Sequence, residues 1–305
     1  MQIFREIKPN LLSASSLALG MFDGVHEGHR MVLADAVQKA ELMGTLATVV
    51  TFANHPQCIT CKTPTRQLTT LEERLELFKI AGIKAALILE FTSEFSEMSA
   101  EAYLKTILVE GLNAKSITIG YDHCFGRDRQ GDYNFLIENK DKFGYAVDVI
   151  QPVTIDGQII SSSVIRNFIT IGNMDFASKL LGRPYSLKGT VVEGKKRGAG
   201  LGFPTANLKV EENLVIPACG IYSGKVEFEG NTYKSVINIG KNPTFGDIDH
   251  ISIEIHIFDF SKNLYNKKIK VSFIQKLRDE KKFSSVDELV KQIKIDCENA
   301  KKSLE

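Results

Sequence analysis

The residues with the clearest potential for chemistry are Thr205 and Asn207, in the stretch Leu201-Gly202-Phe203-Pro204-Thr205-Ala206-Asn207. A glycine-rich run with basic residues, from Gly194 to Gly200, precedes them. Glycines let a backbone approach a ligand closely, and lysine or arginine beside them suits phosphate oxygens. If residues 205 to 207 are extended, both side chains face the same way and offer the hard oxygens that suit Mg²⁺ bridging nucleotide phosphates. The pattern indicates a nucleotide and magnesium site, with a structural turn as the alternative.

Glu254 is a candidate general base. Isoleucines occupy positions 251, 253, 255 and 257, so a strand here would turn Glu254 and His256 to the opposite face. A glutamate in that position can take the proton of a hydroxyl group that attacks a phosphate. The alternative is an ordinary exposed glutamate.

Two histidines, His26 and His29, stand three residues apart in Gly20-Met21-Phe22-Asp23-Gly24-Val25-His26-Glu27-Gly28-His29, directly after a short apolar run. Strand–turn–helix junctions bind nucleotides in open α/β sheets, and free N–H groups at a helix start attract phosphate. Two imidazoles there can donate hydrogen bonds to a phosphate that gains charge in the transition state. The alternative is a pair of surface histidines in a turn.

A second phosphate-binding candidate is Ser161-Ser162-Ser163-Val164-Ile165-Arg166, which follows an extended stretch. Three hydroxyl groups and an arginine at a helix start suit phosphate. A plain serine N-cap is the alternative.

Alternating strand-like and helix-like segments must position the histidines. Such alternation predicts a parallel sheet wrapped by helices. The strands are expected at 16–19, 46–52, 85–90 and 116–119, and the helices at 30–43, 70–81 and 99–108.

The second half has short strand-like segments separated by turns, at 221–228, 232–239, 251–258 and 269–274, and one late helix at 286–304. This predicts a small antiparallel β-barrel with a closing helix. Gly and Pro punctuate the chain at 181–184, so we place the domains at 1–183 and 184–305.

Composition sets broad limits. A chain of 305 residues predicts about two domains, and its net charge of +1 gives no reason to expect a nucleic acid or an anionic membrane as partner. No apolar run approaches the roughly 20 residues of a membrane span, and the start lacks the apolar core of a signal peptide, so the cytoplasm is the expected compartment. Cys58 and Cys61 could be redox-active or half of a zinc site, but we expect an incidental pair.

Together the motifs resemble those of the bacterial bifunctional riboflavin kinase/FAD synthetase family, over essentially the whole chain. The stretches 201–207, 238–246 and 254–260 resemble riboflavin kinase motifs, and 20–29 and 161–166 resemble those of the adenylyltransferase half. The resemblance implies a C-terminal barrel that phosphorylates riboflavin to FMN. It also implies an N-terminal Rossmann-like nucleotidyltransferase domain that converts FMN to FAD. ATP would be the co-substrate and Mg²⁺ the cofactor.

The resemblance also implies roles for individual residues. Glu254 would be the catalytic base, His26, His29 and Arg166 would act on ATP phosphates, and Thr205 and Asn207 would hold Mg²⁺. Nucleotide contacts would come from Gly20, Phe22, Asp23, Gly24, Gly28, Ser162 and Ser163 in the first half and from Gly194, Lys196, Gly202 and Pro204 in the second. Flavin contacts would come from Asp122, Phe125 and Arg127, within a third N-terminal motif at 120–127, and from Arg278 and Phe283.

The chain departs from the family's pattern at three positions. Asn54 replaces a proline in Thr51–Pro56, a change that would loosen that loop; Ala199 replaces an arginine, for which Lys196 or Arg197 would compensate; and Ser163 replaces a threonine but keeps the hydroxyl. Two alternatives to the bifunctional enzyme remain. Only one half could be active, or the protein could be a flavin-binding regulatory or nucleic-acid-binding protein without catalysis, although its near-neutral charge argues against nucleic acid.

Overall fold

The computed structural model describes residues 1–60, 65–194, 200–242 and 250–305. Lys196, Arg197 and Ala199, and residues 243–246 of the motif at 238–246, lie outside these ranges. Contacts divide the chain into two compact units, Met1–Ser162 and Ser163–Glu305. Within the described ranges, no helix combines the length and the hydropathy that a membrane crossing requires.

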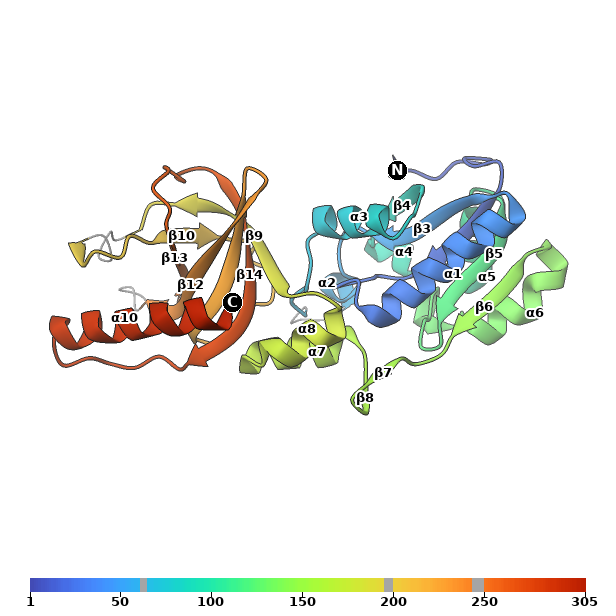
Figure 1. The fold of residues 1–305 in the computed structure, drawn as a ribbon. Coiled ribbons are helices and arrows are strands. Elements are labelled where there is room, and N and C mark those ends of the chain that lie inside the picture. The colour runs from blue at the N-terminus through green and yellow to red at the C-terminus, as the bar shows by residue number, and fades with distance from the viewer. Residues whose placement is uncertain (61–64, 195–199, 243–249) are drawn as a thin grey trace. The chain divides into compact units, whose positions relative to one another are not determined.

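The first unit is built on a six-stranded, wholly parallel sheet with the order β1-β4-β3-β2-β5-β6 (Figure 1). Its strands are mostly short apolar runs, as expected for strands covered on both faces. Their bounds are β1 Gln2–Phe4, β2 Ser15–Leu19, β3 Leu46–Phe52, β4 Ala85–Leu89, β5 Ala114–Gly120 and β6 Ala146–Ile150. The expected parallel sheet is confirmed.

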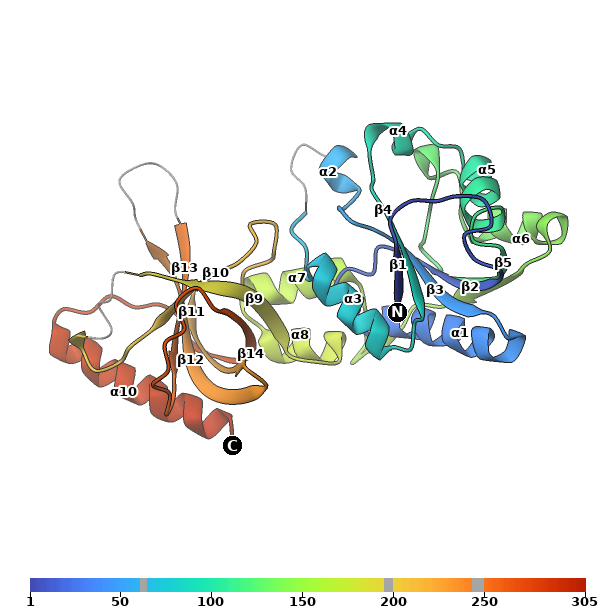
Figure 2. The same cartoon turned by 90° about the horizontal axis from the view of Figure 1, so that it is seen from above.

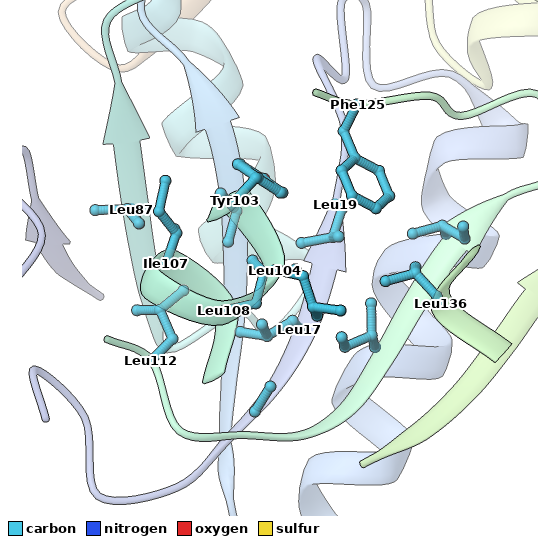
Figure 3. Packing of buried hydrophobic residues seen from close by; sticks show 14 of the residues in the cluster. Leu17, Leu19, Leu87, Tyr103, Leu104, Ile107, Leu108, Leu112, Phe125 and Leu136 are labelled. Carbon is cyan, nitrogen blue, oxygen red and sulfur yellow. The ribbon is translucent and has the colours of Figure 1, made fainter. Parts of the chain in front are cut away.

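Helices cover both faces of this sheet. The side chains of β2 point alternately to the two faces and so belong to two different clusters. Leu17 and Leu19 join one hydrophobic cluster, whereas Ala18 between them joins the other. The first cluster packs under a π-helix (Tyr103–Val109) and α6 (Tyr133–Phe143), as Figure 3 shows for Tyr103 and Leu136. The second packs under α1 (Glu27–Met43) and α3 (Leu71–Ile80), on the opposite face (Figure 2).

Smaller elements complete the first unit. They are α2 (Gln57–Thr60), α4 (Ser93–Ser96), α5 (Ala100–Ala102), a 3-10 turn at Arg127–Arg129, and a hairpin of β7 (Thr154–Ile155) and β8 (Gln158–Ile159). The helix expected at 99–108 is α-helical only in its first turn and continues with π geometry, because the apolar pattern does not distinguish the two kinds of turn.

The second unit is a closed antiparallel barrel with the order β10-β13-β12-β11-β14-β9, closed by the pairing of β10 with β9 (Figure 1). Its strands are β9 Tyr185–Val192, β10 Ala206–Lys209, β11 Gly220–Phe228, β12 Asn231–Asn242, β13 His250–Ile257 and β14 Lys268–Arg278. The last helix, α10 (Val286–Ser303), packs on β11, β12 and β14. The expected barrel with a closing helix is confirmed.

Two further helices, α7 (Ser162–Ile171) and α8 (Met174–Leu181), precede the barrel. α8 packs on β9 and β14, and the backbone N–H of Ala218 donates to the carbonyl of Ile169 at 3.3 Å. Contacts therefore place these helices with the second unit, whereas the sequence led us to put the domain boundary after them, at 183/184.

Candidate active sites

A tight turn joins β2 to α1 and carries the motif of residues 20–29. Phe22, Gly24 and Val25 all have positive φ, at 52°, 84° and 40°. Phe22 and Val25 are buried at 2% and 1% exposure, so packing holds these two non-glycine residues in a conformation they rarely adopt. Backbone strain of this kind concentrates at ligand-binding and catalytic turns.

The two histidines meet at the start of α1. The Nδ1 atom of His26 accepts a hydrogen bond from the backbone N–H of His29 at 3.2 Å and so caps the helix. Because Nδ1 is the acceptor, the neutral His26 ring carries its proton on Nε2 and keeps that N–H as a donor. The two rings stack, with centroids 3.5 Å apart and planes at 17°. The structure thus brings both imidazoles to a helix N-terminus, where anions bind.

The buried side chain of Asp23 stabilises this turn by hydrogen bonds. Its carboxylate is buried and accepts hydrogen bonds from the backbone N–H groups of Leu68, at 2.9 Å, and Thr69, at 3.1 Å. The carbonyl of Asp23 accepts from the hydroxyl of Ser162 at 2.9 Å. Both side chains were expected to contact a nucleotide, and their hydrogen bonds tie the turn to neighbouring segments.

Arg166 and Ser163 lie together on α7, where Nη1 of Arg166 donates to the Ser163 hydroxyl at 3.4 Å. Ser163 is exposed, whereas Arg166 is half-buried. The predicted pairing of a hydroxyl group and a guanidinium near the start of one helix is therefore present.

The loop after β5 holds three predicted flavin contacts. Phe125 is 8% exposed and packs on Tyr103 and Phe135, with ring centroids 5.2 and 6.0 Å away, so it anchors the loop in the core (Figure 3). Asp122 and Arg127 are exposed. The phenyl ring thus fixes the loop, and the two charged side chains are open to a ligand.

The same loop contains His123, which sequence reasoning missed. Its Nε2 atom is buried and has no hydrogen-bond partner among the described residues. Burial lowers the pKa of His123 to about 4, so the ring is neutral at pH 7. Only its position inside the 120–127 motif could have singled it out.

Asn54 corrects an expectation. Its Nδ2 donates to the carbonyl of Phe91 at 2.8 Å, and its Oδ1 accepts from the N–H of Phe91 at 2.8 Å. The side chain therefore clamps the loop after β3 to the loop after β4. The prediction that an asparagine here would loosen the loop was wrong.

In the barrel, Glu254 lies in a row of polar residues on three adjacent strands. Asn207 of β10 is directly opposite Glu254 of β13 on one side, and Asn238 of β12 is opposite on the other. The isoleucines at 253, 255 and 257 are buried in the barrel, so Glu254 faces the other way, as predicted. Directly opposed side chains have Cβ atoms about 5 Å apart, so the predicted base and one predicted metal ligand are neighbours.

A cavity of about 270 Å³ opens in front of this row. It has the apolar walls and few convergent polar groups that are typical of small-molecule sites. The structure brings four of the predicted residues to it, namely Thr205, Glu254, Arg278 and Phe283. Apolar side chains of Phe203, Ile221, Val236, Leu289 and Ile293 complete much of the wall.

A second cavity of about 350 Å³ lies on the other side of the Thr205 segment. Pro204, Thr205 and Ala206 line it, together with the ends of β9 and β13 and residues 260–265. Thr205 therefore borders both cavities, whereas Glu254 borders only the first.

The segment before β10 is fixed by close contacts. The Asn207 side-chain amide occupies the space where a Cβ at Gly194 would stand, so any larger residue at position 194 would have to displace that amide. Gly202 has φ of 86°. The Pro204 carbonyl accepts from Nδ1 of His256 at 2.8 Å, because a carbonyl can only accept.

Arg278 is held by a residue that sequence reasoning missed. Its Nε and Nη2 donate to the two carboxylate oxygens of Asp296 on α10, at 2.9 and 2.6 Å. Asp296 is 4% exposed, and both residues line the first cavity. No spacing in the sequence relates a strand end to the middle of the last helix.

Comparisons with known proteins agree on both units. A family model described as FAD synthetase matches residues 8–164, and one described as riboflavin kinase matches residues 181–304. A bifunctional riboflavin kinase/FMN adenylyltransferase of Listeria monocytogenes is 36% identical over 92% of this chain and 89% of its own length. Those of Haemophilus influenzae and Bacillus subtilis are each 35% identical, over 95% and 94% of this chain and 94% and 91% of their own lengths.

A solved structure from Streptococcus pneumoniae, described as a macrolide-efflux protein, has a TM-score of 0.87 and 33% identity, covering 97% of this chain and 96% of that one. The same two-part fold therefore extends over nearly the whole chain.

These matches and the two sites define the class as flavin-cofactor transferases that join a nucleotidyltransferase unit to a kinase unit. The chain belongs to the family of bifunctional riboflavin kinase/FMN adenylyltransferases. The family, the fold and the enzyme class predicted from the motifs are confirmed.

Proposed function

We propose that the barrel unit phosphorylates riboflavin to FMN and that FMN is then adenylylated to FAD at the β2–α1 turn of the sheet unit. ATP serves both reactions. The placement of Thr205 between two cavities carries the kinase half of this proposal, and the stacked histidines at the start of α1 carry the other half.

In the kinase site, the flavin occupies the 270 Å³ cavity and the nucleotide occupies the 350 Å³ cavity. The 5′-hydroxyl of riboflavin then lies beside Glu254, and the γ-phosphate of ATP lies beside Thr205. The hydroxyl oxygen attacks the γ-phosphorus, Glu254 accepts the hydroxyl proton, and ADP leaves. Arg278 and Phe283 border the flavin, where an aromatic ring can pack on the isoalloxazine.

The residues around Thr205 fit Mg²⁺. The Thr205 hydroxyl and the Asn207 carbonyl are hard oxygen donors, and the Glu254 carboxylate directly across the sheet from Asn207 adds negative charge nearby. Contact with the backbone at Gly194 restricts the Asn207 amide. When bound, the ion would neutralise phosphate charge, and Thr205 and Asn207 would hold it.

In the adenylyltransferase site, the Nε2–H of His26, the His29 imidazole and the N-terminus of α1 hold the ATP phosphates. That Arg166 and Ser163 of α7 also act on the ATP phosphates stays a prediction from the sequence. An FMN phosphate oxygen attacks the α-phosphorus, pyrophosphate leaves, and no protein nucleophile takes part. Positioning and charge stabilisation supply the rate, and Asp122 and Arg127 contact the flavin substrate.

Separate assays of the two steps test the kinase site. Glu254→Gln should lower riboflavin phosphorylation about 100-fold or more and leave conversion of added FMN to FAD unchanged. Glu227→Gln is the matched control, because Glu227 is exposed on β11 and pairs with Lys270. Flavins are separated by chromatography. Unchanged phosphorylation by the Glu254→Gln protein would remove Glu254 as the base.

His26→Asn tests the other site without disturbing the fold, because asparagine is also a good N-cap. It should abolish most FAD formation from FMN and leave riboflavin phosphorylation intact. Loss of both activities would argue against two separate sites. If the wild-type protein forms no new flavin from riboflavin, ATP and Mg²⁺, the alternative of a non-catalytic flavin-binding protein takes over.

A further inference from the structure

Arg74 on α3 is the largest fully buried side chain of the chain's described part, with 0% exposure. Arginine is almost never fully buried unless it is paired, and a buried charge normally faces a carboxylate. Among the residues that the structure describes, no carboxylate forms an ion pair or hydrogen bond with Arg74. The charge of Asp23 acts on it only from a longer distance.

The guanidinium of Arg74 joins two loops instead. Nη1 donates to the carbonyl of Met21 at 2.9 Å and to the Thr51 hydroxyl at 3.2 Å, and Nη2 donates to the carbonyl of Ala53 at 3.4 Å. Met21 belongs to the turn after β2, and Ala53 follows β3, the neighbouring parallel strand. Ligands bind in open α/β sheets at the carboxyl ends of such strands.

The charge on Arg74 persists at neutral pH. Burial lowers its pKa to about 10, and Asp23 opposes that shift. The Nε atom is also buried and has no hydrogen-bond partner within the described ranges. A desolvated cation without a paired carboxylate reduces stability, and its field is screened less than that of a surface charge. The fold keeps such a group directly behind the turn that carries His26 and His29.

We propose that Arg74 is a positioning residue of the adenylyltransferase site. Its guanidinium fixes the Met21 carbonyl and the Thr51–Ala53 segment, and its buried positive charge favours the ATP polyphosphate at the N-terminus of α1. This inference rests on the proposed FMN adenylyltransferase activity. A purely structural arginine would stabilise the unit but would leave ATP affinity unchanged once the protein is folded.

Three variants of the full chain separate these roles. Arg74→Met removes the charge and the donors, and Arg74→Lys keeps a charge but loses the planar fork. Lys79→Met is the matched control, because it removes an exposed cation from the end of the same helix. For each variant, the KM for ATP and the kcat of FMN-to-FAD conversion are measured between pH 7 and 9. Riboflavin phosphorylation in the same samples and thermal unfolding report on folding.

Arg74→Met should lower kcat/KM for FAD synthesis about 10- to 100-fold, mainly by raising the KM for ATP. Riboflavin phosphorylation by the same protein should stay at the wild-type level. The Lys79→Met protein should keep both activities at the wild-type level. Arg74→Lys should retain most activity at pH 7 and lose it towards pH 9, because burial lowers a lysine pKa, whereas the wild type stays level. If Arg74→Met does not fold, this pH profile alone carries the test.

The proposal is overturned if both variants melt at lower temperature yet keep the wild-type KM for ATP and a level pH profile. If the wild-type protein makes no FAD from added FMN, the proposed adenylyltransferase function fails first and the role of Arg74 falls with it. That result differs from a failure of the positioning role alone, in which wild-type FAD synthesis proceeds.

Discussion

Replacing Asp296 with asparagine should destabilise the barrel unit and weaken flavin binding together. The carboxylate is 4% exposed and accepts three hydrogen bonds, two from Arg278 at 2.9 and 2.6 Å and one from Gln292 at 3.0 Å. Asparagine has the same shape but no charge, and its NH₂ group would face a guanidinium donor. Arg278 would lose its fixed position at the wall of the first cavity.

The loss of stability caused by Asp296→Asn can be estimated from how far the ion pair is buried. Removing one partner of a fully buried ion pair costs about 3–5 kcal/mol. The Arg278 side chain remains 22% exposed, so water takes over part of its solvation, and asparagine keeps one acceptor oxygen. We therefore expect a loss of about 2–3 kcal/mol in the free energy of unfolding of the second unit. For a unit of this size, that corresponds to a fall of about 5–10 °C in its melting temperature.

Calorimetry of the full chain measures this shift, and Asp279→Asn is the control. Asp279 lies one residue after Arg278 but pairs with Lys276 at the surface and is 86% exposed, so its replacement should leave the melting temperature unchanged. The Asp296→Asn protein should also show a KM for riboflavin raised about tenfold. If the two variants melt at the same temperature, the ion pair does not stabilise the unit and our reasoning from burial is refuted.

Three other changes have defined outcomes. Asn54→Ala should cost about 1–2 kcal/mol in urea unfolding and lower FAD synthesis but not riboflavin phosphorylation; equal stability would show that the clamp contributes nothing. Gly194→Ala should displace Asn207 and raise the Mg²⁺ concentration that phosphorylation requires, with FAD synthesis as the internal control. Burial holds the pKa of His123 near 4, below its ordinary value of 6.5, so the unfolded chain takes up this proton first as pH falls. The wild type should therefore lose up to about 3 kcal/mol of stability between pH 6.5 and 4, a loss that His123→Phe removes; parallel pH profiles would contradict this assignment.

Patterns among residues close in the sequence predicted the features that depend on local backbone geometry, such as the direction of a side chain in a strand and the start of a helix. Alternating isoleucines fixed which way Glu254 faces, because side chains in a strand alternate between its two faces. The spacing of His26 and His29 brought both rings to the first turn of one helix. The helix expected at 70–81 is α3, and the Thr70 hydroxyl caps it by accepting from the N–H of Glu73 at 3.1 Å.

Contacts between distant segments could not be predicted in this way. Arg74 lies 53 residues after Met21, and Asp296 lies 18 residues after Arg278, so only the finished fold brings their atoms together. Asn54 shows why a substitution is hard to interpret alone. Proline restricts φ, so its loss suggested a looser loop, yet the partner that restores order, Phe91, stands 37 residues further along the chain.

Thr205 connects the two cavities of the proposed kinase site. A hydroxyl group and the phosphate that it attacks must approach to about 3–3.5 Å, so a flavin and a nucleotide in separate cavities need a common border. Thr205 is that border, since it lines both. Across the sheet, Asn207 and Glu254 are directly opposed, so the proposed metal ligand and the proposed proton acceptor have Cβ atoms about 5 Å apart. Because side chains in a strand alternate between its two faces, a shift of β10 by one residue would turn Asn207 away from Glu254.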